Sequence, residues 1–214
     1  MKEVLVVLNG IYKNKKEQYK NIINSFDIII AVDGGYKFLK NIINYEPDII
    51  IGDFDSLDKS SPLLKNFEGE IYEFSSDKDK TDGELALDYC KRNDYKDITL
   101  IGATGGRIDQ QFGNITLLEY ALESEIKAKI MEPGLEIGIT NDRIEVKGKE
   151  NYTLSIFSLS DKVFIKKLQG VKYELKDYWL NRASSRGISN VIKDKTAVIK
   201  VDNGILLYFL CETC

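Results

Sequence analysis

The stretch that decides the fold is PDIIIGDFDS, residues 47–56. Its first half is a short, continuously apolar run, which is typical of a strand buried on both faces of a parallel sheet. Its second half changes at once to a glycine and two carboxylates. This pattern indicates an α/β protein, because ligands bind at the carboxyl ends of the strands in an open parallel sheet.

The same pattern recurs through the first part of the chain. Segments of helical period lie between the apolar runs, most clearly at residues 81–91 and 109–122, and the runs stand at 4–8, 27–32, 48–51, 71–74, 98–101 and 127–131. Right-handed crossovers between such strands place helices on both faces of the sheet. We therefore predict a doubly wound, mostly parallel α/β domain over residues 1–132.

After Pro133-Gly134 the periodicity changes to that of half-buried strands. Segments of period two, separated by Asn, Asp, Gly and Ser turn signals, stand at residues 143–146, 153–157, 163–167, 196–201 and 205–210. This pattern predicts an antiparallel β-sandwich over residues 135–214.

Composition excludes several kinds of function. The chain has 30 Lys and Arg residues against 34 Asp and Glu, so it lacks the basic excess of nucleic-acid-binding proteins. It has no histidine, which removes the commonest general base and the commonest transition-metal ligand. Its apolar runs are too short for a membrane span or a signal sequence. We expect a cytoplasmic protein that binds neither nucleic acid nor membranes.

Four motifs follow predicted strands of the first domain: Asp33-Gly34-Gly35, residues 52–56 (GDFDS), residues 77–82 (DKDKTD) and residues 102–109 (GATGGRID). Their loops should meet at one edge of the sheet. Carboxylates crowded there repel one another, and Mg²⁺ relieves the repulsion while it also binds phosphate oxygens. The glycines let main-chain N–H groups approach a polyphosphate, and Arg107 offers a guanidinium fork.

Each motif alone has a plainer interpretation, such as a turn at Asp33 or a capping box formed by Thr81 and Glu84. Their coincidence after four strands favours a magnesium and polyphosphate site.

In this order and spacing, the motifs resemble the bacterial thiamine pyrophosphokinase family over nearly the whole chain. In the second half, residues 170–175 (GVKYEL) and 184–190 (SSRGISN) are similar to that family's C-terminal signature. The resemblance implies a catalytic domain that binds ATP and Mg²⁺, followed by a sandwich that binds thiamine and mediates dimerisation. It also implies a homodimer with the active site at the subunit interface. The implied reaction moves a diphosphate from ATP to the hydroxyl of thiamine, giving thiamine diphosphate and AMP.

The resemblance also gives the motif residues expected roles. The expected catalytic residues are Asp53, Asp55, Asp82 and Arg107. The expected metal ligands are Asp53, Asp55, Asp77, Asp79 and Asp82. Contacts with ATP and its phosphates are expected from Gly34, Gly35, Ser56, Asp79, Lys80, Thr81, Gly105, Gly106, Asp109 and Gln110. Contacts with thiamine are expected from Asp33, Trp179, Ser184, Ser185, Ser189 and Asn190.

Three positions stay open to more than one interpretation. Asp109 either orients Arg107 or contacts the nucleotide. Gln110 stands where the family often has histidine, so it can form hydrogen bonds but cannot carry a proton charge. Trp179 suits a contact with the thiazolium cation, although a place in the sandwich core explains it equally well.

Two other functions stay open. A diphosphokinase of the same fold would act on a hydroxymethyl pterin, but the SSRGISN segment favours thiamine. A non-catalytic nucleotide or thiamine sensor would be free to lose carboxylates, and every motif aspartate is present.

Overall fold

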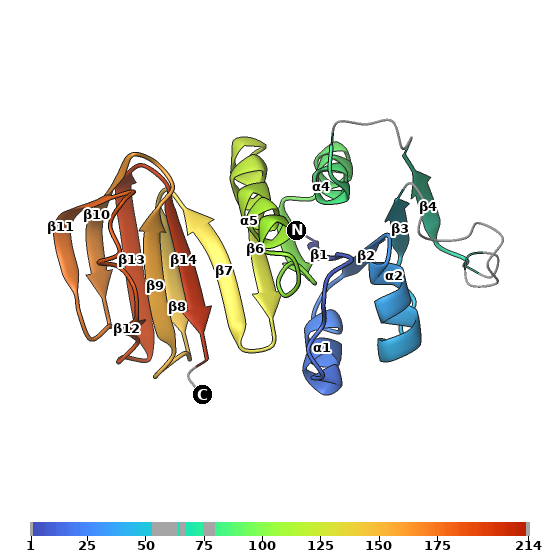
Figure 1. The fold of residues 1–214 in the computed structure, drawn as a ribbon, viewed down its shortest axis with the longest axis horizontal. Helices are drawn as coiled ribbons and strands as arrows, with labels where there is room; N and C mark the ends of the chain where they lie inside the picture. The colour runs from blue at the N-terminus through green and yellow to red at the C-terminus, as the bar shows by residue number, and fades with distance from the viewer. Residues whose placement is uncertain (1, 53–63, 65–66, 75–79, 213–214) are drawn as a thin grey trace. The chain divides into compact units, whose positions relative to one another are not determined.

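The computed structural model describes residues 2–52, 64, 67–74 and 80–212 (Figure 1). The chain divides into two compact units, Met1–Pro133 and Gly134–Cys214.

The described strands of the first unit form a parallel sheet. They are β1 (Glu3–Val7), β2 (Ile28–Val32), β3 (Ile49–Gly52), β4 (Glu70–Glu73), β5 (Asp97–Ile101) and β6 (Lys127–Glu132), in the order β6-β5-β1-β2-β3-β4. The chain starts at β1, builds outward to β4, and then returns to place β5 on the other side of β1. The strand order therefore reverses between β1 and β5, and such a switch point is where α/β proteins bind ligands.

Helices cover both faces of this sheet (Figure 1). One face carries α1 (Lys16–Ile23) and α2 (Gly35–Lys37), which continues as the π-helical segment η1 (Phe38–Ile43). The other face carries α4 (Asp82–Arg92) and α5 (Ile108–Glu123). Leu5 and Ile29 pack with Tyr19 of α1 in one buried cluster, and all five residues of β2 are buried. The doubly wound α/β prediction is confirmed.

The second unit contains two antiparallel sheets. Their strands are β7 (Leu135–Thr140), β8 (Arg143–Lys147), β9 (Thr153–Ser158), β10 (Lys162–Gln169), β11 (Leu175–Asn181), β12 (Asn190–Val191), β13 (Thr196–Asn203) and β14 (Leu206–Cys211). Within this unit one sheet has the order β12-β9-β14-β7, and the other has the order β11-β10-β13-β8. Leu154 and Leu206 of the first sheet share a buried cluster with Ile165 and Ile199 of the second. The predicted β-sandwich is therefore confirmed.

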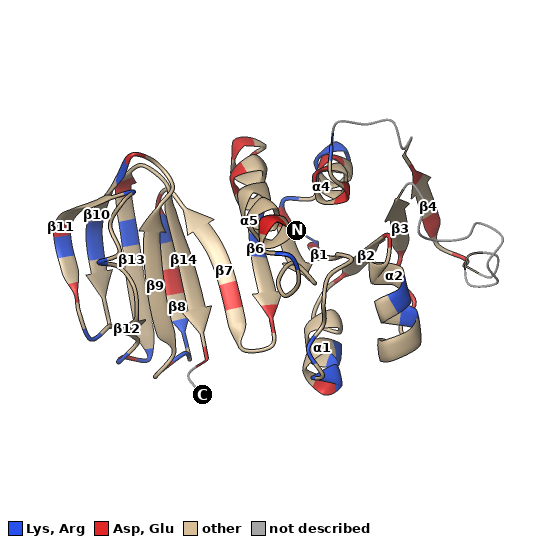
Figure 2. Cartoon of the chain, in the orientation of Figure 1, with Lys and Arg blue, Asp and Glu red and all other residues tan. Residues whose placement is uncertain are grey.

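The described surface carries charges of both signs. Figure 2 shows basic and acidic residues interspersed along the elements of both units, in keeping with the near balance of the composition. None of the described helices has the length and apolar character needed to cross a membrane.

Candidate active site

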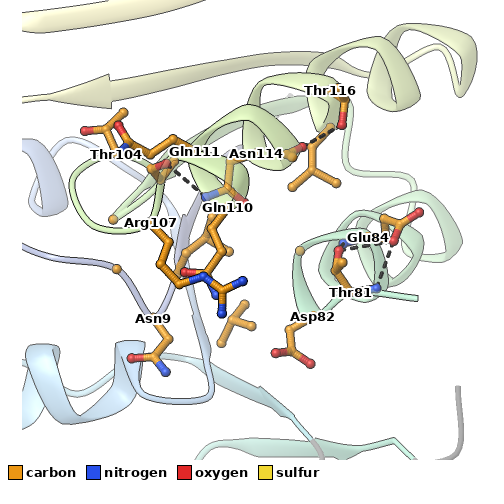
Figure 3. A pocket seen from close by; sticks show the side chains of 18 of the residues that line it. Asn9, Thr81, Asp82, Glu84, Thr104, Arg107, Gln110, Gln111, Asn114 and Thr116 are labelled. Atoms are coloured by element: carbon orange, nitrogen blue, oxygen red, sulfur yellow. Dashed lines mark hydrogen bonds between the residues drawn. The ribbon is translucent and has the colours of Figure 1, made fainter. Parts of the chain in front are cut away.

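A pocket of about 490 Å³ lies in the first unit at the switch point (Figure 3). The residues directly after β1 and those after β5 line it, together with Val32 at the end of β2 and the first turns of α4 and α5. Figure 3 shows Asp82 and Arg107 extending into the same opening from α4 and from the start of α5. The pocket thus brings together residues from two of the predicted motifs, DKDKTD and GATGGRID.

The start of α4 is fixed by a capping box. The Thr81 hydroxyl oxygen accepts a hydrogen bond from the Glu84 main-chain N–H at 3.3 Å, and the Glu84 carboxylate accepts one from the Thr81 N–H at 2.8 Å. The sequence prediction of this box is confirmed. It makes Asp82 the first helical residue, where the helix dipole favours a negative charge.

The start of α5 presents a cation. Arg107 is the N-cap residue and follows Gly105 and Gly106, which have φ angles of +80° and +110°. Its Nε donates to the Asp109 carboxylate at 3.1 Å, and an Nη donates to the other carboxylate oxygen at 2.5 Å. This hydrogen bonding raises the pKa of Arg107 and lowers that of Asp109, although both side chains are exposed. The structure thus favours Asp109 as the residue that orients Arg107.

Gln110 lines the pocket beside this pair. Its main-chain N–H donates to the Asp109 carboxylate at 3.0 Å, which fixes the first turn of the helix. Gln111 secures the preceding loop, because its side-chain amide donates to the Gly106 carbonyl at 3.1 Å.

Sequence reasoning missed several residues that line the pocket. Asn9 and Gly10 follow β1, and a Cβ on Gly10 would lie 1.8 Å from the Gly102 carbonyl oxygen, so the β1 and β5 loops touch there. Asn114 of α5 donates to the Ala103 carbonyl at 2.9 Å, and Tyr120 forms part of the wall. The signal that could have found Asn9 and Gly10 is the topological switch point, since the loops on both sides of such a point contact the ligand.

Gly34 and Gly35, predicted to contact phosphate, have a packing role in the described structure. A Cβ on Gly35 would lie 2.0 Å from the Val7 carbonyl oxygen, and one on Gly34 would lie 2.1 Å from the side chain of Asn9. Both glycines therefore let α2 start close against β1. Asp33 is buried, and its carbonyl accepts from the Tyr36 N–H at 3.0 Å, which closes the turn.

Lys80 lies at the margin of the pocket in an ion pair. Its Nζ donates to the Asp88 carboxylate at 2.6 Å and to the Tyr120 hydroxyl at 3.3 Å. Tyr120 also donates to Asp88. These bonds raise the pKa of Lys80 and direct its charge toward Asp88.

Of the five predicted metal ligands, Asp82 is the one that belongs to the described residues. Asp53, Asp55, Ser56, Asp77 and Asp79 lie outside the described residues. Within the described ranges, no group of three or more His, Cys, Asp or Glu residues is arranged to hold a metal ion.

In the second unit, Trp179 lies on β11 and is 43% exposed. Its ring centroid is 4.9 Å from that of Phe164, and the Lys162 Nζ lies 4.4 Å from the ring. The interpretation of Trp179 as a core residue is wrong, because the ring packs on an exposed side of its sheet.

Asn190 joins the two C-terminal motifs. It is buried, its side-chain oxygen accepts from the Tyr173 N–H at 3.0 Å, and its side-chain nitrogen donates to the Tyr173 carbonyl at 2.8 Å. Ser189 has a φ of 61° and donates its N–H to the Ser155 hydroxyl at 3.1 Å. A contact between Asn190 and a ligand would have to replace these bonds.

The other two serines close tight turns in the same segment. The Ser184 hydroxyl accepts from the Arg186 N–H at 3.2 Å, and the Ser185 carbonyl accepts from the Ile188 N–H at 3.2 Å.

Two family models match this chain. One, described as "Thiamin pyrophosphokinase, catalytic domain", matches residues 19–130. The other, described as "Thiamin pyrophosphokinase, vitamin B1 binding domain", matches residues 141–206. The chain belongs to the thiamine pyrophosphokinase family. The protein is therefore an enzyme of the transferase class.

Individual relatives agree with this family assignment. The chain is 27% identical to the thiamine pyrophosphokinase of Bacillus subtilis over 97% of both chains. The crystal structure of a thiamin pyrophosphokinase from Geobacillus thermodenitrificans matches with a TM-score of 0.82 and 26% identity over 98% of both chains. The crystal structure of the Bacillus subtilis protein shares the fold with a TM-score of 0.84 over the whole of both chains.

Proposed function

We propose that this thiamine pyrophosphokinase family member transfers a diphosphate from ATP to the hydroxyl of thiamine, with Mg²⁺, releasing AMP and thiamine diphosphate. The observation that carries the proposal is the arrangement of Arg107 and Asp82. One is a cation at the start of α5 and the other a carboxylate at the start of α4, and both line the pocket at the β1–β5 switch point.

The pocket suits a nucleotide triphosphate. Its volume of about 490 Å³ is within the usual range for small-molecule sites. Two helix N-termini face it, and helix N-termini favour phosphate groups. Asp82 alone would repel a polyphosphate, so this donor set fits a site in which a hard cation stands between carboxylate and phosphate.

Mg²⁺ would be held by Asp82 together with Asp53, Asp55, Asp77 and Asp79 of the GDFDS and DKDKTD motifs. When bound, the ion neutralises phosphate charge and fixes the orientation of the polyphosphate.

The protein's own side chains mainly position the substrates and neutralise charge on the transferred group. Phosphoryl-type transfer depends on in-line positioning and charge stabilisation more than on covalent chemistry. Arg107, oriented by Asp109, is directed at the charge that develops on the transferred group. Gln110 donates or accepts hydrogen bonds at the same wall and moves no proton.

The second unit would supply the residues that bind thiamine. The exposed ring of Trp179 offers a face to the thiazolium cation, and Ser184, Ser185 and Ser189 offer polar groups to the aminopyrimidine ring. The homodimer, the active site shared between subunits and the cytoplasmic location stay parts of this proposal.

Product identification tests the reaction directly. The protein is incubated with ATP, Mg²⁺ and thiamine, and the products are identified by mass spectrometry, with a hydroxymethyl pterin as the alternative acceptor. We expect AMP and thiamine diphosphate in equal amounts. ADP with thiamine monophosphate would show a simple kinase, and turnover of the pterin alone would show a different acceptor.

A further inference from the structure

Glu132, at the end of β6, is a buried carboxylate to which sequence reasoning gave no role. Its side chain is 3% exposed. One carboxylate oxygen accepts a hydrogen bond from the Tyr19 hydroxyl at 2.7 Å, and the other accepts from the Ala103 N–H at 3.1 Å. The main-chain N–H groups of Gly102 and Thr104 also lower the pKa of this carboxyl group by stabilising its charged form.

Three consecutive amides of the loop after β5 therefore act on this one carboxyl group, and that of Ala103 donates a hydrogen bond to it. Consecutive amides that point to one place form an anion-binding concavity, and charge-assisted bonds of this kind are the strong ones. Here the carboxyl group of Glu132 takes this place. Burial raises the pKa of Glu132, while the hydrogen bonds from Tyr19 and the loop amides oppose that rise by stabilising the charged form.

The same segment is held on its other sides. Gly102 has a φ of +70°, and a Cβ there would lie 2.3 Å from the Tyr12 hydroxyl, so the ring of Tyr12 lies directly against it. Asn114 donates to the Ala103 carbonyl at 2.9 Å. Residues 102–104 are thus fixed, and the next residues, Gly105 to Arg107, lead into the first turn of α5.

We propose that Glu132 is a positioning residue for this loop, whose first half it holds and whose second half contacts the nucleotide. It holds residues 102–104 in place through the amide of Ala103, and it thereby directs the following segment, Gly105 to Arg107, to the phosphates of the nucleotide. The inference rests on the proposed use of ATP, and it adds which half of the loop binds phosphate and which residue sets its conformation.

The test replaces Glu132 by glutamine, which keeps the size of the side chain but removes its charge and one acceptor oxygen. The probe is α,β-methylene-ATP with Mg²⁺, whose methylene bridge prevents loss of the terminal diphosphate, and its Kd is measured by calorimetry. We expect the Kd to rise about tenfold or more, because small displacements of a positioning group have effects of this size. The KM for thiamine should stay within about twofold of wild type, because the change acts on the nucleotide loop. A general loss of folding would instead lower the number of binding sites per chain found by calorimetry.

Two variants serve as controls. Glu136→Gln makes the same chemical change at a second Glu–Tyr pair, where the carboxylate accepts from the Tyr208 hydroxyl at 3.1 Å in the other unit. Tyr19→Phe removes one bond to Glu132 and leaves the bond from the Ala103 amide in place. Both should bind α,β-methylene-ATP with nearly the wild-type Kd. A wild-type Kd in Glu132→Gln would overturn the proposal.

Hydrogen exchange in the wild-type protein gives an answer even if Glu132→Gln does not fold. The amides of Gly102 to Thr104 should be protected without ligand and unchanged by it, whereas those of Gly105 to Arg107 should slow when α,β-methylene-ATP is added. The reverse pattern overturns the proposal, and so does a wild-type protein that binds no nucleotide. If nucleotide binds as described but thiamine diphosphate is not formed, the proposed reaction fails and the role of Glu132 stands.

Discussion

At the scale of single residues, the described pocket combines opposite charges at two helix starts. Asp82 and Arg107 each occupy a position fixed by the local main chain, one by a capping box and the other by two glycines with positive φ. Their charges therefore enter the pocket at set places. This makes conservative substitutions informative, since the fold has little reason to change with them.

Asp82→Asn should lower kcat/KM by about a hundredfold or more, if Asp82 holds the cation that the polyphosphate needs. The loss of charge at the start of α4 should reduce stability by only about 0.5 kcal/mol. Formation of AMP and thermal unfolding are both measured. Asp94→Asn is the matched control, because it makes the same change just beyond the other end of the same helix, at a φ of 57° that asparagine tolerates. Nearly normal activity of Asp82→Asn would contradict the metal assignment.

Asp109→Asn should lower kcat/KM by about tenfold, because Arg107 keeps its charge but loses the group that orients it. Arg107→Ala should lower it much further. Arg107 depresses the pKa of Asp109, so the ion pair is complete above the ordinary pKa of aspartate and is lost only as the pH falls through the lowered value. The ratio of wild-type to Asp109→Asn activity should therefore be constant between about pH 6 and 9. A ratio that changes within this range would contradict the pairing.

At the scale of elements, two glycines of the first unit predict opposite effects of one substitution. Gly35→Ala should destabilise by about 2 kcal/mol or more, because the added Cβ would lie 2.0 Å from the Val7 carbonyl oxygen. Gly113→Ala should stabilise by about 0.5–1 kcal/mol, because this glycine is within α5 and a Cβ there meets nothing within 4 Å. Urea unfolding measures both. Destabilisation by Gly113→Ala would contradict this prediction, because it would show that the space beside Gly113 must stay free of a side chain.

Thr81→Ala should cost about 1 kcal/mol through loss of the capping box of α4. For a chain of this length, that corresponds to a decrease in Tm of about 2–4 °C. The matched control is Thr116→Ala, which removes a hydroxyl that bonds to the Gly113 carbonyl within α5 and should leave the Tm nearly unchanged. Equal decreases in Tm for the two variants would show that the capping box contributes no more to stability than an ordinary threonine hydroxyl in a helix.

The elements that could be predicted from the sequence are those with a strong periodicity of apolar residues. The apolar runs and the helices at 81–91 and 109–122 correspond to strands and helices of the described structure with small shifts at their ends. The segments Phe38–Ile43 and Leu135–Thr140 were not predicted. The first is a short π-helical turn whose hydrogen bonding no local periodicity encodes. The second begins directly after Gly134, where the turn signal suggested a boundary rather than a strand.

At the scale of the whole molecule, the motif loops could be predicted to share one edge because parallel strands place their ends there. The part played by Asn9 and Gly10 could not, because it depends on β5 returning beside β1, and strand order is set by long-range packing. The same holds for Glu132, whose partners Tyr19 and Ala103 are far from it in sequence.

A shared active site predicts complementation between subunits. Arg107→Ala and Ser185→Trp alter different units, so a mixture of the two inactive variants should regain part of the activity if each site uses both chains. The mixture is unfolded, refolded and assayed for AMP, with each variant alone treated in the same way. No recovery in mixed dimers would indicate a site within one chain.

Chelation tests the cation. Excess EDTA should abolish activity, and Mg²⁺ in excess of the chelator should restore it, because the carboxylate-rich loops and the polyphosphate repel each other without a cation. Thermal unfolding should change little, since a buried apolar cluster holds each unit together. Activity that persists in EDTA would contradict the role of magnesium.

The central place of β1 in its sheet has a consequence during synthesis. Val4 pairs with Ile28 on one side and with Ile98 on the other. The ribosome makes β1 first, and β2 follows soon, but the second edge of β1 stays unpaired until β5 has emerged. An open strand edge is a template for unwanted pairing between nascent chains. The time that the ribosome takes to translate the residues between β2 and β5 therefore sets how long this edge of β1 stays open to such pairing.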